Sequence, residues 1–333
     1  MFLGLSVFTG KRTHLSPVNK CELEFPMNLA HLHDGVAVLT GSASGLGYAM
    51  AVKCCRLHMK TVVLSDLRPQ ALSTAVATLS QLHPSTTVVG IVCDVSQPSS
   101  VQHLLTSIRQ QFPQQPIRFL SANAGILFPK STILSGTDEE WALTYRVNVL
   151  GLASTLKVFT NHMMQQQGDS CIEITASSAG VVMGGLGPYG TSKHAALAIA
   201  EGLHGELMAR GMHRKIHMVV LCPAIVETAL LDSSFAIAQQ ASGNTALSTD
   251  ARENDAASVG TVSLFHNTIK SGMSAEFCAE RVFQSLEKGE FYCILDNDVE
   301  RDGFCLGLNE KIGARAVAML TGGAPNRTRG GKL

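Results

Sequence analysis

Residues 36–47 read V-A-V-L-T-G-S-A-S-G-L-G, and this stretch decides the fold of the 333-residue chain. Its first five residues form a short apolar run suited to a buried parallel strand. The glycine-rich turn that follows leads into a helical segment, Tyr48 to His58. Such a turn brings the backbone close to a pyrophosphate while the helix N-terminus supplies N–H donors. A flexible surface loop is the alternative, but the strand–turn–helix context favours a dinucleotide site.

A second expected strand, Thr61 to Ser65, leads to an acidic residue where the ribose of a dinucleotide would lie. Asp66 follows Gly45 by 21 residues, and an acidic side chain at about that spacing accepts hydrogen bonds from the adenosine ribose. Its carboxylate would repel a 2′-phosphate, which favours NAD over NADP. Arg68 can pair with such a phosphate, so NADP stays the alternative.

Strands and helices continue to alternate, which indicates β-α-β units, a parallel sheet and right-handed crossovers. Asp94, Asn123 and the segment Cys222 to Thr228 each follow a strand, at the sheet edge where such folds bind ligands. The sequence therefore predicts an α/β fold, a Rossmann-type doubly wound parallel sheet. The expected strands are 36–40, 61–65, 87–93, 117–122, 170–176, 216–221 and 291–295, and the expected helices are 48–58, 69–83, 98–112, 138–167, 188–210 and 274–288.

This pattern predicts one domain with an extension at each end. The alternation runs through residues 34–300, so residues 1–33 and 301–333 are expected to be extensions. Residues 229–274 lack clear periodicity and are longer than an ordinary connection. Long segments of this kind in a compact domain are often lids or binding loops. We interpret 229–274 as a lid over the substrate.

Composition excludes several classes of function. The 26 Lys and Arg residues balance the 26 Asp and Glu residues, so no net field draws the chain to nucleic acid or to an anionic membrane. Hydrophobic residues make up 45% of the chain, yet no apolar run approaches the roughly 18 residues that span a bilayer. The nine cysteines include no C-x-x-C pair. They indicate reduced, mostly buried thiols, with neither a disulfide framework nor a metal site.

Both ends of the chain carry weak targeting signals. Lys11, Arg12 and Lys20 precede the first acidic residue, Glu22, as in an organelle transit peptide. The final Gly331-Lys332-Leu333 differs from the peroxisomal S-K-L only in its first residue. We expect a cytoplasmic protein, with import into an organelle or the peroxisome as alternatives.

The stretch from Ser177 to Lys193 brings together a hydroxyl, a phenol and an amine. Tyr189 and Lys193 are four residues apart, so on a helix that starts near Pro188 their side chains share one face. An ammonium beside a tyrosine favours the phenolate and moves the phenol pKa of about 10 towards the range of a general base. Ser177 can donate a hydrogen bond to a substrate carbonyl oxygen as charge builds on it. These side chains form a candidate catalytic centre of an oxidoreductase.

With these motifs in order, the chain resembles the short-chain dehydrogenase/reductase family, in its ordinary non-extended subgroup, over roughly residues 34–300. The resemblance implies that Tyr189 exchanges a proton with the substrate oxygen, that Lys193 also binds the nicotinamide ribose and that Asn148 holds a proton-relaying water. It also implies a set of cofactor-binding residues at the strand ends. Gly41, Ser44, Gly45, Leu46 and Gly47 would line the pyrophosphate turn, Asp66 the adenosine ribose, Asp94 and Val95 the adenine, Asn123 and Gly125 the middle of the cofactor, and Val226 and Thr228 the nicotinamide carboxamide.

Two positions depart from the family pattern, and the serine assignment has an alternative. Ala122 stands where the family usually has Asn, and Ala224 where it usually has Gly. The methyl group of Ala224 is expected to alter the placement of the nicotinamide. Ser177 is preferred over Ser178 because it lies twelve residues before Tyr189.

We expect an oxidoreductase that transfers a hydride between NAD(H) and a small to medium-sized, fairly apolar alcohol or ketone by a Ser-Tyr-Lys-Asn mechanism. An NADPH-dependent carbonyl reductase is the closest alternative. The others are a non-catalytic dinucleotide-binding sensor or scaffold, and an isomerase or lyase that keeps its nicotinamide bound. By resemblance alone, subunits pair through the helices that contain Asn148 and Lys193, which gives a homodimer or homotetramer.

Overall fold

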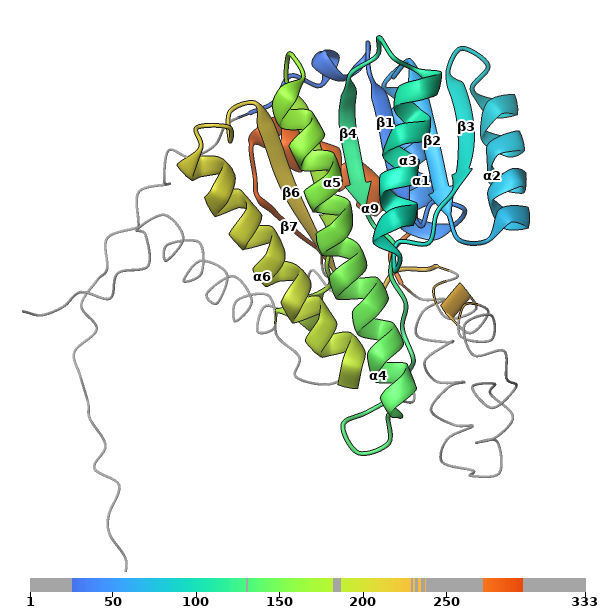
Figure 1. The fold of residues 1–333 in the computed structure, drawn as a ribbon, viewed down its shortest axis with the longest axis vertical. Helices are drawn as coiled ribbons and strands as arrows, with labels where there is room; N and C mark the ends of the chain where they lie inside the picture. Colours follow the sequence, from blue (N-terminus) through green and yellow to red (C-terminus); the bar gives the residue numbers. More distant parts are fainter. Residues whose placement is uncertain are drawn as a thin grey trace, which may run out of the picture.

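The computed structural model describes residues 26–129, 131–181, 187–228, 230, 233–234, 237 and 272–295. Within these residues, seven strands form one parallel sheet in the order β3-β2-β1-β4-β5-β6-β7 (Figure 1). The strands are β1 (Val36–Thr40), β2 (Thr61–Asp66), β3 (Thr87–Val92), β4 (Ile117–Ala122), β5 (Ser170–Thr175), β6 (Ile216–Pro223) and β7 (Tyr292–Leu295). The α/β fold predicted from the sequence is confirmed.

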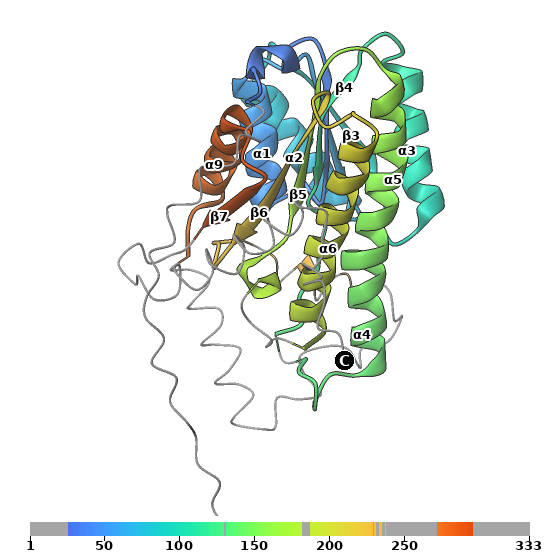
Figure 2. The same cartoon turned by 90° about the vertical axis from the view of Figure 1, so that its left-hand side faces the viewer.

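Helices cover both faces of the sheet, so the domain has three layers (Figure 2). On one side, α1 (Gly45–Arg56), α2 (Pro69–Leu82) and α9 (Ala275–Lys288) pack against the strands. On the other side lie α3 (Pro98–Gln111), α5 (Leu152–Gln165) and α6 (Gly187–Ala209), with the short α4 (Asp138–Tyr145) beyond the sheet edge (Figures 1 and 2). None of the helices in the described part of the chain is long and apolar enough to cross a membrane.

Local signals in the sequence explain where several helices begin and end. Pro69 and Pro98 stand in the first turns of α2 and α3, where a proline loses no helical hydrogen bond. The hydroxyl of Ser274 accepts a hydrogen bond from the amide of Phe277 and caps α9. That helix ends at Gly289, whose φ of 74° is left-handed.

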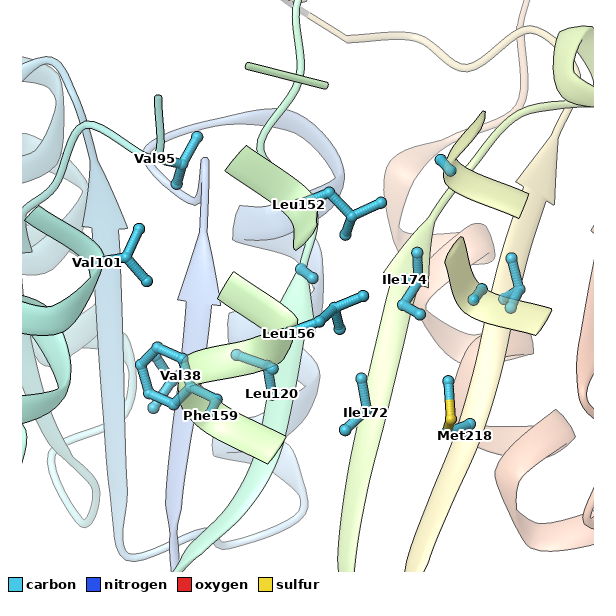
Figure 3. Packing of buried hydrophobic residues seen from close by; sticks show 14 of the residues in the cluster. Val38, Val95, Val101, Leu120, Leu152, Leu156, Phe159, Ile172, Ile174 and Met218 are labelled. Atoms are coloured by element: carbon cyan, nitrogen blue, oxygen red, sulfur yellow. The ribbon is translucent and has the colours of Figure 1, made fainter. Parts of the chain in front are cut away.

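The two faces of the sheet bury separate apolar cores, because neighbouring residues of a strand point to opposite sides. Phe159 of α5, Leu120 of β4 and Ile172 of β5 belong to the core on one face (Figure 3). On the other face, Phe119 of β4 stacks on Phe283 of α9, with ring centroids 5.0 Å apart. Strands that are buried on both faces read as continuous apolar runs, which is why they were visible in the sequence.

The region 138–167, expected as one helical stretch, is divided in the structure. A π-helical turn, Arg146–Gly151, lies between α4 and α5 and contains Asn148. Its side chain accepts a hydrogen bond from the amide of Ile126 at 2.8 Å and donates one to the carbonyl oxygen of Ile126 at 2.9 Å. This pairing depends on a loop distant in sequence, so helical periodicity does not reveal the turn.

Residues 26–33 pack against the domain although the sequence placed them in the N-terminal extension. Met27 and Leu32 are buried in the core shared with α1 and α9, and the amide of Met27 donates to the carbonyl oxygen of Leu286 at 3.2 Å. The expected boundaries of the domain stay a prediction. Residues 1–25 and 296–333 lie outside the described residues, as does nearly all of the expected lid 229–274.

Candidate active site

The glycine-rich turn joins β1 to α1 at the carboxyl edge of the sheet, where the strand order reverses between β1 and β4. Gly41 has a φ of 61°, and a Cβ at this position would lie 2.8 Å from Cα of Ala124. A Cβ at Gly47 would lie 2.7 Å from both Nδ2 of Asn123 and the carbonyl oxygen of Gly41. Ser44 precedes α1 without capping it by a side-chain hydrogen bond. The turn therefore offers backbone N–H groups at a helix N-terminus, which suits a pyrophosphate.

Asp66 ends β2 beside this turn and is buried. Its Oδ2 accepts a hydrogen bond from the amide of Ala43 at 3.2 Å. Arg68 binds the carboxylate with two nitrogens, Nε to Oδ1 at 2.9 Å and Nη2 to Oδ2 at 3.2 Å. The same Nη2 lies 3.3 Å from the hydroxyl oxygen of Ser44. Asp66, which favours NAD, and Arg68, which keeps NADP as the alternative, are thus paired at one end of the turn.

The segment after β4 is tied to the glycine turn. Asn123 donates from Nδ2 to the carbonyl oxygens of Thr40 and Gly41, at 3.0 and 3.1 Å. Its amide donates to the hydroxyl of Thr40 at 3.1 Å. A Cβ at Gly125 would lie 3.4 Å from Oδ1 of Asn148 and 3.6 Å from Nζ of Lys193. Asn123 and Gly125 thus connect the glycine turn to the candidate catalytic residues.

Tyr189 and Lys193 lie on one face of α6, as their spacing predicts, and both are buried. Nζ of Lys193 lies 5.7 Å from the centroid of the Tyr189 ring. It donates a hydrogen bond to the carbonyl oxygen of Thr175 at 2.8 Å. Ser177, which caps the short turn Ser178–Gly180, lies close enough to Tyr189 to lower the pKa of its phenol. This contact favours Ser177 over Ser178.

Burial, rather than Lys193, has the largest effect on the pKa of Tyr189. It raises the pKa of Tyr189 above its ordinary value, and the hydrogen bond with Ser177 opposes this shift. Burial also lowers the pKa of Lys193 to about 8, against the opposing influence of Glu173 and Cys222. The pKa of Tyr189 is therefore raised, not lowered as the sequence suggested, because the domain excludes water from the phenol.

Asn148 reaches the same site from the π-helical turn. Nδ2 donates to the hydroxyl of Ser192 at 3.0 Å, and that hydroxyl donates to the carbonyl oxygen of Tyr189 at 2.7 Å. With the two bonds to Ile126, both amide hydrogens of Asn148 are used, while Oδ1 keeps one lone pair for a further donor.

The remaining predicted residues follow β3 or β6, or lie in the first turn of α1. Thr228 packs against the glycine turn, since a Cβ at Gly45 would lie 3.2 Å from Cβ of Thr228. Val226 is buried and bridges to Met273.

The carboxylate of Asp94 accepts a hydrogen bond from the amide of Ser96 at 2.9 Å and so closes a local turn. Leu46 lies in the first turn of α1, and Val95 is buried against the backbone of Gly151.

Sequence reasoning missed an acidic group beneath the site. Glu173 lies in the middle of β5 and is fully buried. The hydroxyl of Ser121 donates to its Oε2 at 2.6 Å, and the hydroxyl of Thr175 lies 2.8 Å from its Oε1. Burial raises the pKa of Glu173 to about 7. The sequence feature that could have revealed this group is Glu173 itself, a charged residue inside a largely apolar strand of a sheet buried on both faces.

The comparisons with known proteins agree with this geometry. The short chain dehydrogenase family model matches residues 35–238. The 1-deoxy-11-beta-hydroxypentalenate dehydrogenase of Streptomyces avermitilis is 29% identical over 222 residues, which cover 66% of this chain and 78% of that protein. Dehydrogenase/reductase SDR family member 4 of Mus musculus is 28% identical over 197 residues, 59% of this chain and 67% of that protein.

A solved structure extends the likeness over most of the chain. The short chain dehydrogenase/reductase from Burkholderia phymatum, in complex with NAD, superposes with a TM-score of 0.69 at 28% identity. The match covers 91% of this chain and 99% of that one. A glycine turn, a buried Tyr–Lys pair and a family model that matches more than half of the chain lead to one assignment: this chain is an oxidoreductase that belongs to the short-chain dehydrogenase/reductase family.

Proposed function

We propose that this enzyme transfers a hydride between NAD(H) and a small to medium-sized, fairly apolar alcohol or ketone, with Tyr189 as the acid and base. The observation that carries the proposal is the burial of Tyr189, Lys193 and Ser177 in one site at the sheet edge that also holds the glycine turn. The related enzymes are named dehydrogenases, and the Burkholderia structure contains NAD.

The side chains divide the proton chemistry among them. In reduction, the neutral phenol of Tyr189 donates a proton to the substrate oxygen, and in oxidation the phenolate accepts it. Ser177 orients that oxygen and stabilises its developing charge. The ammonium of Lys193 favours the phenolate, and Oδ1 of Asn148 can hold a water that exchanges protons with solvent. The nicotinamide, when bound, supplies or receives the hydride.

The cofactor assignments follow the same geometry. Gly41, Gly45 and Gly47 would leave room for the pyrophosphate, with Ser44 and Leu46 beside it, and Asp66 would accept hydrogen bonds from the adenosine ribose. Asp94 and Val95 are assigned to the adenine, and Val226 and Thr228 to the carboxamide of the nicotinamide. Asn123 and Gly125 are assigned to the middle of the cofactor. The pairing of Asp94 with Ser96 leaves its second carboxylate oxygen for the adenine.

Replacing Tyr189 by Phe tests the catalytic assignment. Loss of the phenol should lower kcat/KM by at least about 100-fold, the usual contribution of a general acid and base. NADH affinity should change little, because the ring remains. Tyr145→Phe is the matched control, since Tyr145 stacks on Trp141 outside the site. Unchanged turnover in Tyr189→Phe would contradict the mechanism, and absence of turnover in the unmodified protein across a panel of alcohols and ketones would favour a sensor or scaffold.

An NADPH-dependent carbonyl reductase is the second candidate, and the fork of Arg68 on Asp66 and Ser44 favours it. The guanidinium already neutralises the carboxylate, so repulsion of a 2′-phosphate is weakened. We expect higher kcat/KM with NADH than with NADPH, and a further loss of NADPH use in Arg68→Gln. Equal or better use of NADPH by the unmodified enzyme would overturn the preference for NAD.

The homodimer or homotetramer stays a prediction. Leu150, in the π-helical turn, is 62% exposed and lies on the helical surface through which subunits are expected to pair. Light scattering coupled to size-exclusion chromatography measures the mass of the assembly, and a monomer at micromolar concentration would contradict the expectation.

A further inference from the structure

The hydroxyl of Thr175 stands between two acceptors and has one hydrogen to give. Its Oγ1 lies 2.8 Å from Oε1 of Glu173 and 3.1 Å from Oδ1 of Asn123. The orientation of the Asn123 amide is fixed, because its Nδ2 donates to two backbone carbonyl oxygens of the glycine turn. Oδ1 of Asn123 therefore needs a donor, and the carboxylate of Glu173 competes for it.

The protonation state of Glu173 decides this competition. When the carboxyl is neutral, its own hydrogen can be donated to Oγ1 of Thr175, which leaves the Thr175 hydroxyl free to donate to Asn123. When Glu173 is ionised, both carboxylate oxygens need donors. The Ser121 hydroxyl donates to Oε2 at 2.6 Å, and the Thr175 hydroxyl must then donate to Oε1. Within this partly buried cluster, only the neutral form of Glu173 gives each acceptor a donor from the protein.

The cluster connects directly to both halves of the active site. The carbonyl oxygen of Thr175 accepts the hydrogen bond from Nζ of Lys193. On the other side, Asn123 holds the backbone of Thr40 and Gly41. Glu173 can thus affect the glycine turn through the hydrogen bond from Thr175 to Asn123. It does so without contacting a ligand itself.

We propose that Glu173 is a positioning residue whose proton controls how firmly Thr175 and Asn123 hold the glycine turn, so that the enzyme binds its dinucleotide more tightly when Glu173 is neutral. This inference rests on the proposed dinucleotide site. The loss of one hydrogen bond on ionisation should weaken cofactor binding by about 2- to 10-fold.

The surroundings of Glu173 determine the pH at which its carboxyl loses the proton. Burial raises the pKa of Glu173 to about 7, while Ser121, Thr175 and the charge of Lys193 lower it. Among the described residues, the charged and titratable groups that act on it are Lys193 on α6 and Cys293 on β7. Burial raises the pKa of the Cys293 thiol to about 11, so it stays neutral through this range. On α1, Met50 contributes its uncharged sulfur beside Ser121, at 3.3 Å.

Three variants separate the effect of the hydrogen bond from the effect of the charge. Glu173→Gln is neutral at every pH, and we expect its dissociation constant for NADH to be flat between about pH 6 and pH 7.5, where that of the unmodified enzyme rises. Thr175→Val keeps Glu173 and the carbonyl contact with Lys193 but removes the hydroxyl, so its NADH affinity should be weak and independent of pH. Thr175→Ser keeps the hydroxyl and should restore the pH dependence.

Infrared spectroscopy follows the Glu173 proton without cofactor. The carbonyl band of a protonated carboxylic acid, absent from Glu173→Gln, should disappear from the unmodified protein with a midpoint near the pKa of about 7. A carboxylate already ionised at about pH 6, or the same pH dependence of NADH binding in both proteins, would overturn the inference. If NADH fails to bind at any pH while the band titrates as expected, the proposed dinucleotide site is wrong.

Discussion

The exclusion of water sets the chemistry of the individual residues in the candidate site, because Tyr189, Lys193 and Glu173 are all buried. The spacing of Tyr189 and Lys193 placed both on one helix face, because a helix brings residues four apart together. The pKa shifts depend on water exclusion by distant elements, which no short motif encodes. Glu173 was missed for the same reason, since its partners Ser121 and Thr175 come from two strands.

These shifts predict different pH profiles for the two directions of the reaction. Because burial raises the pKa of Tyr189, phenolate is scarce near neutrality. The kcat/KM for alcohol oxidation should therefore rise from about pH 7 until Lys193, whose ammonium favours the phenolate, loses its proton with a pKa of about 8. Ketone reduction starts from the neutral phenol. Its rate should stay level and then fall as Lys193 loses its proton with a pKa of about 8. Initial rates measured in both directions across this range check the prediction, and an oxidation rate that is independent of pH would contradict it.

At the scale of elements, strands were easier to predict than the boundaries and irregularities of helices. The predicted strands agree with the structure to within a residue or two. For the central strands the reason is burial on both faces, which makes them continuous apolar runs. The π-helical turn Arg146–Gly151 was not predicted, since the contacts of Asn148 with Ile126 are formed only when β4 and α5 pack together. A motif shows that an element exists, whereas its distortions follow from tertiary contacts.

The junction of β1 and α1 yields a prediction of its own. In Gly47→Ala, the new Cβ would lie 2.7 Å from Nδ2 of Asn123 and from the carbonyl oxygen of Gly41, so the turn must shift. We expect NADH affinity to fall at least about 10-fold and the free energy of unfolding to fall by about 1–3 kcal/mol. Gly202→Ala on α6 is the matched control, because its Cβ would meet nothing within 4 Å. That variant should gain about 0.5–1 kcal/mol from the helix propensity of alanine. Fluorescence titration and urea unfolding measure both quantities, and an intact NADH affinity in Gly47→Ala would contradict the role of the turn.

At the scale of the whole molecule, the core extends before the predicted start of the domain at residue 34. Leu32 is fully buried among residues of the α1, α2 and α9 face, although nothing in the local pattern of residues 26–33 resembles a strand or a long helix. Leu32→Ala should therefore cost about 2–5 kcal/mol, as for other buried leucines. The midpoint of urea unfolding should fall with no change in its slope. Leu82→Ala is the control, because Leu82 is 62% exposed and its loss should change the free energy of unfolding by less than about 0.5 kcal/mol. Equal unfolding midpoints for the two variants would show that the segment before residue 34 adds nothing to the stability of the domain, and the predicted boundary would then stand.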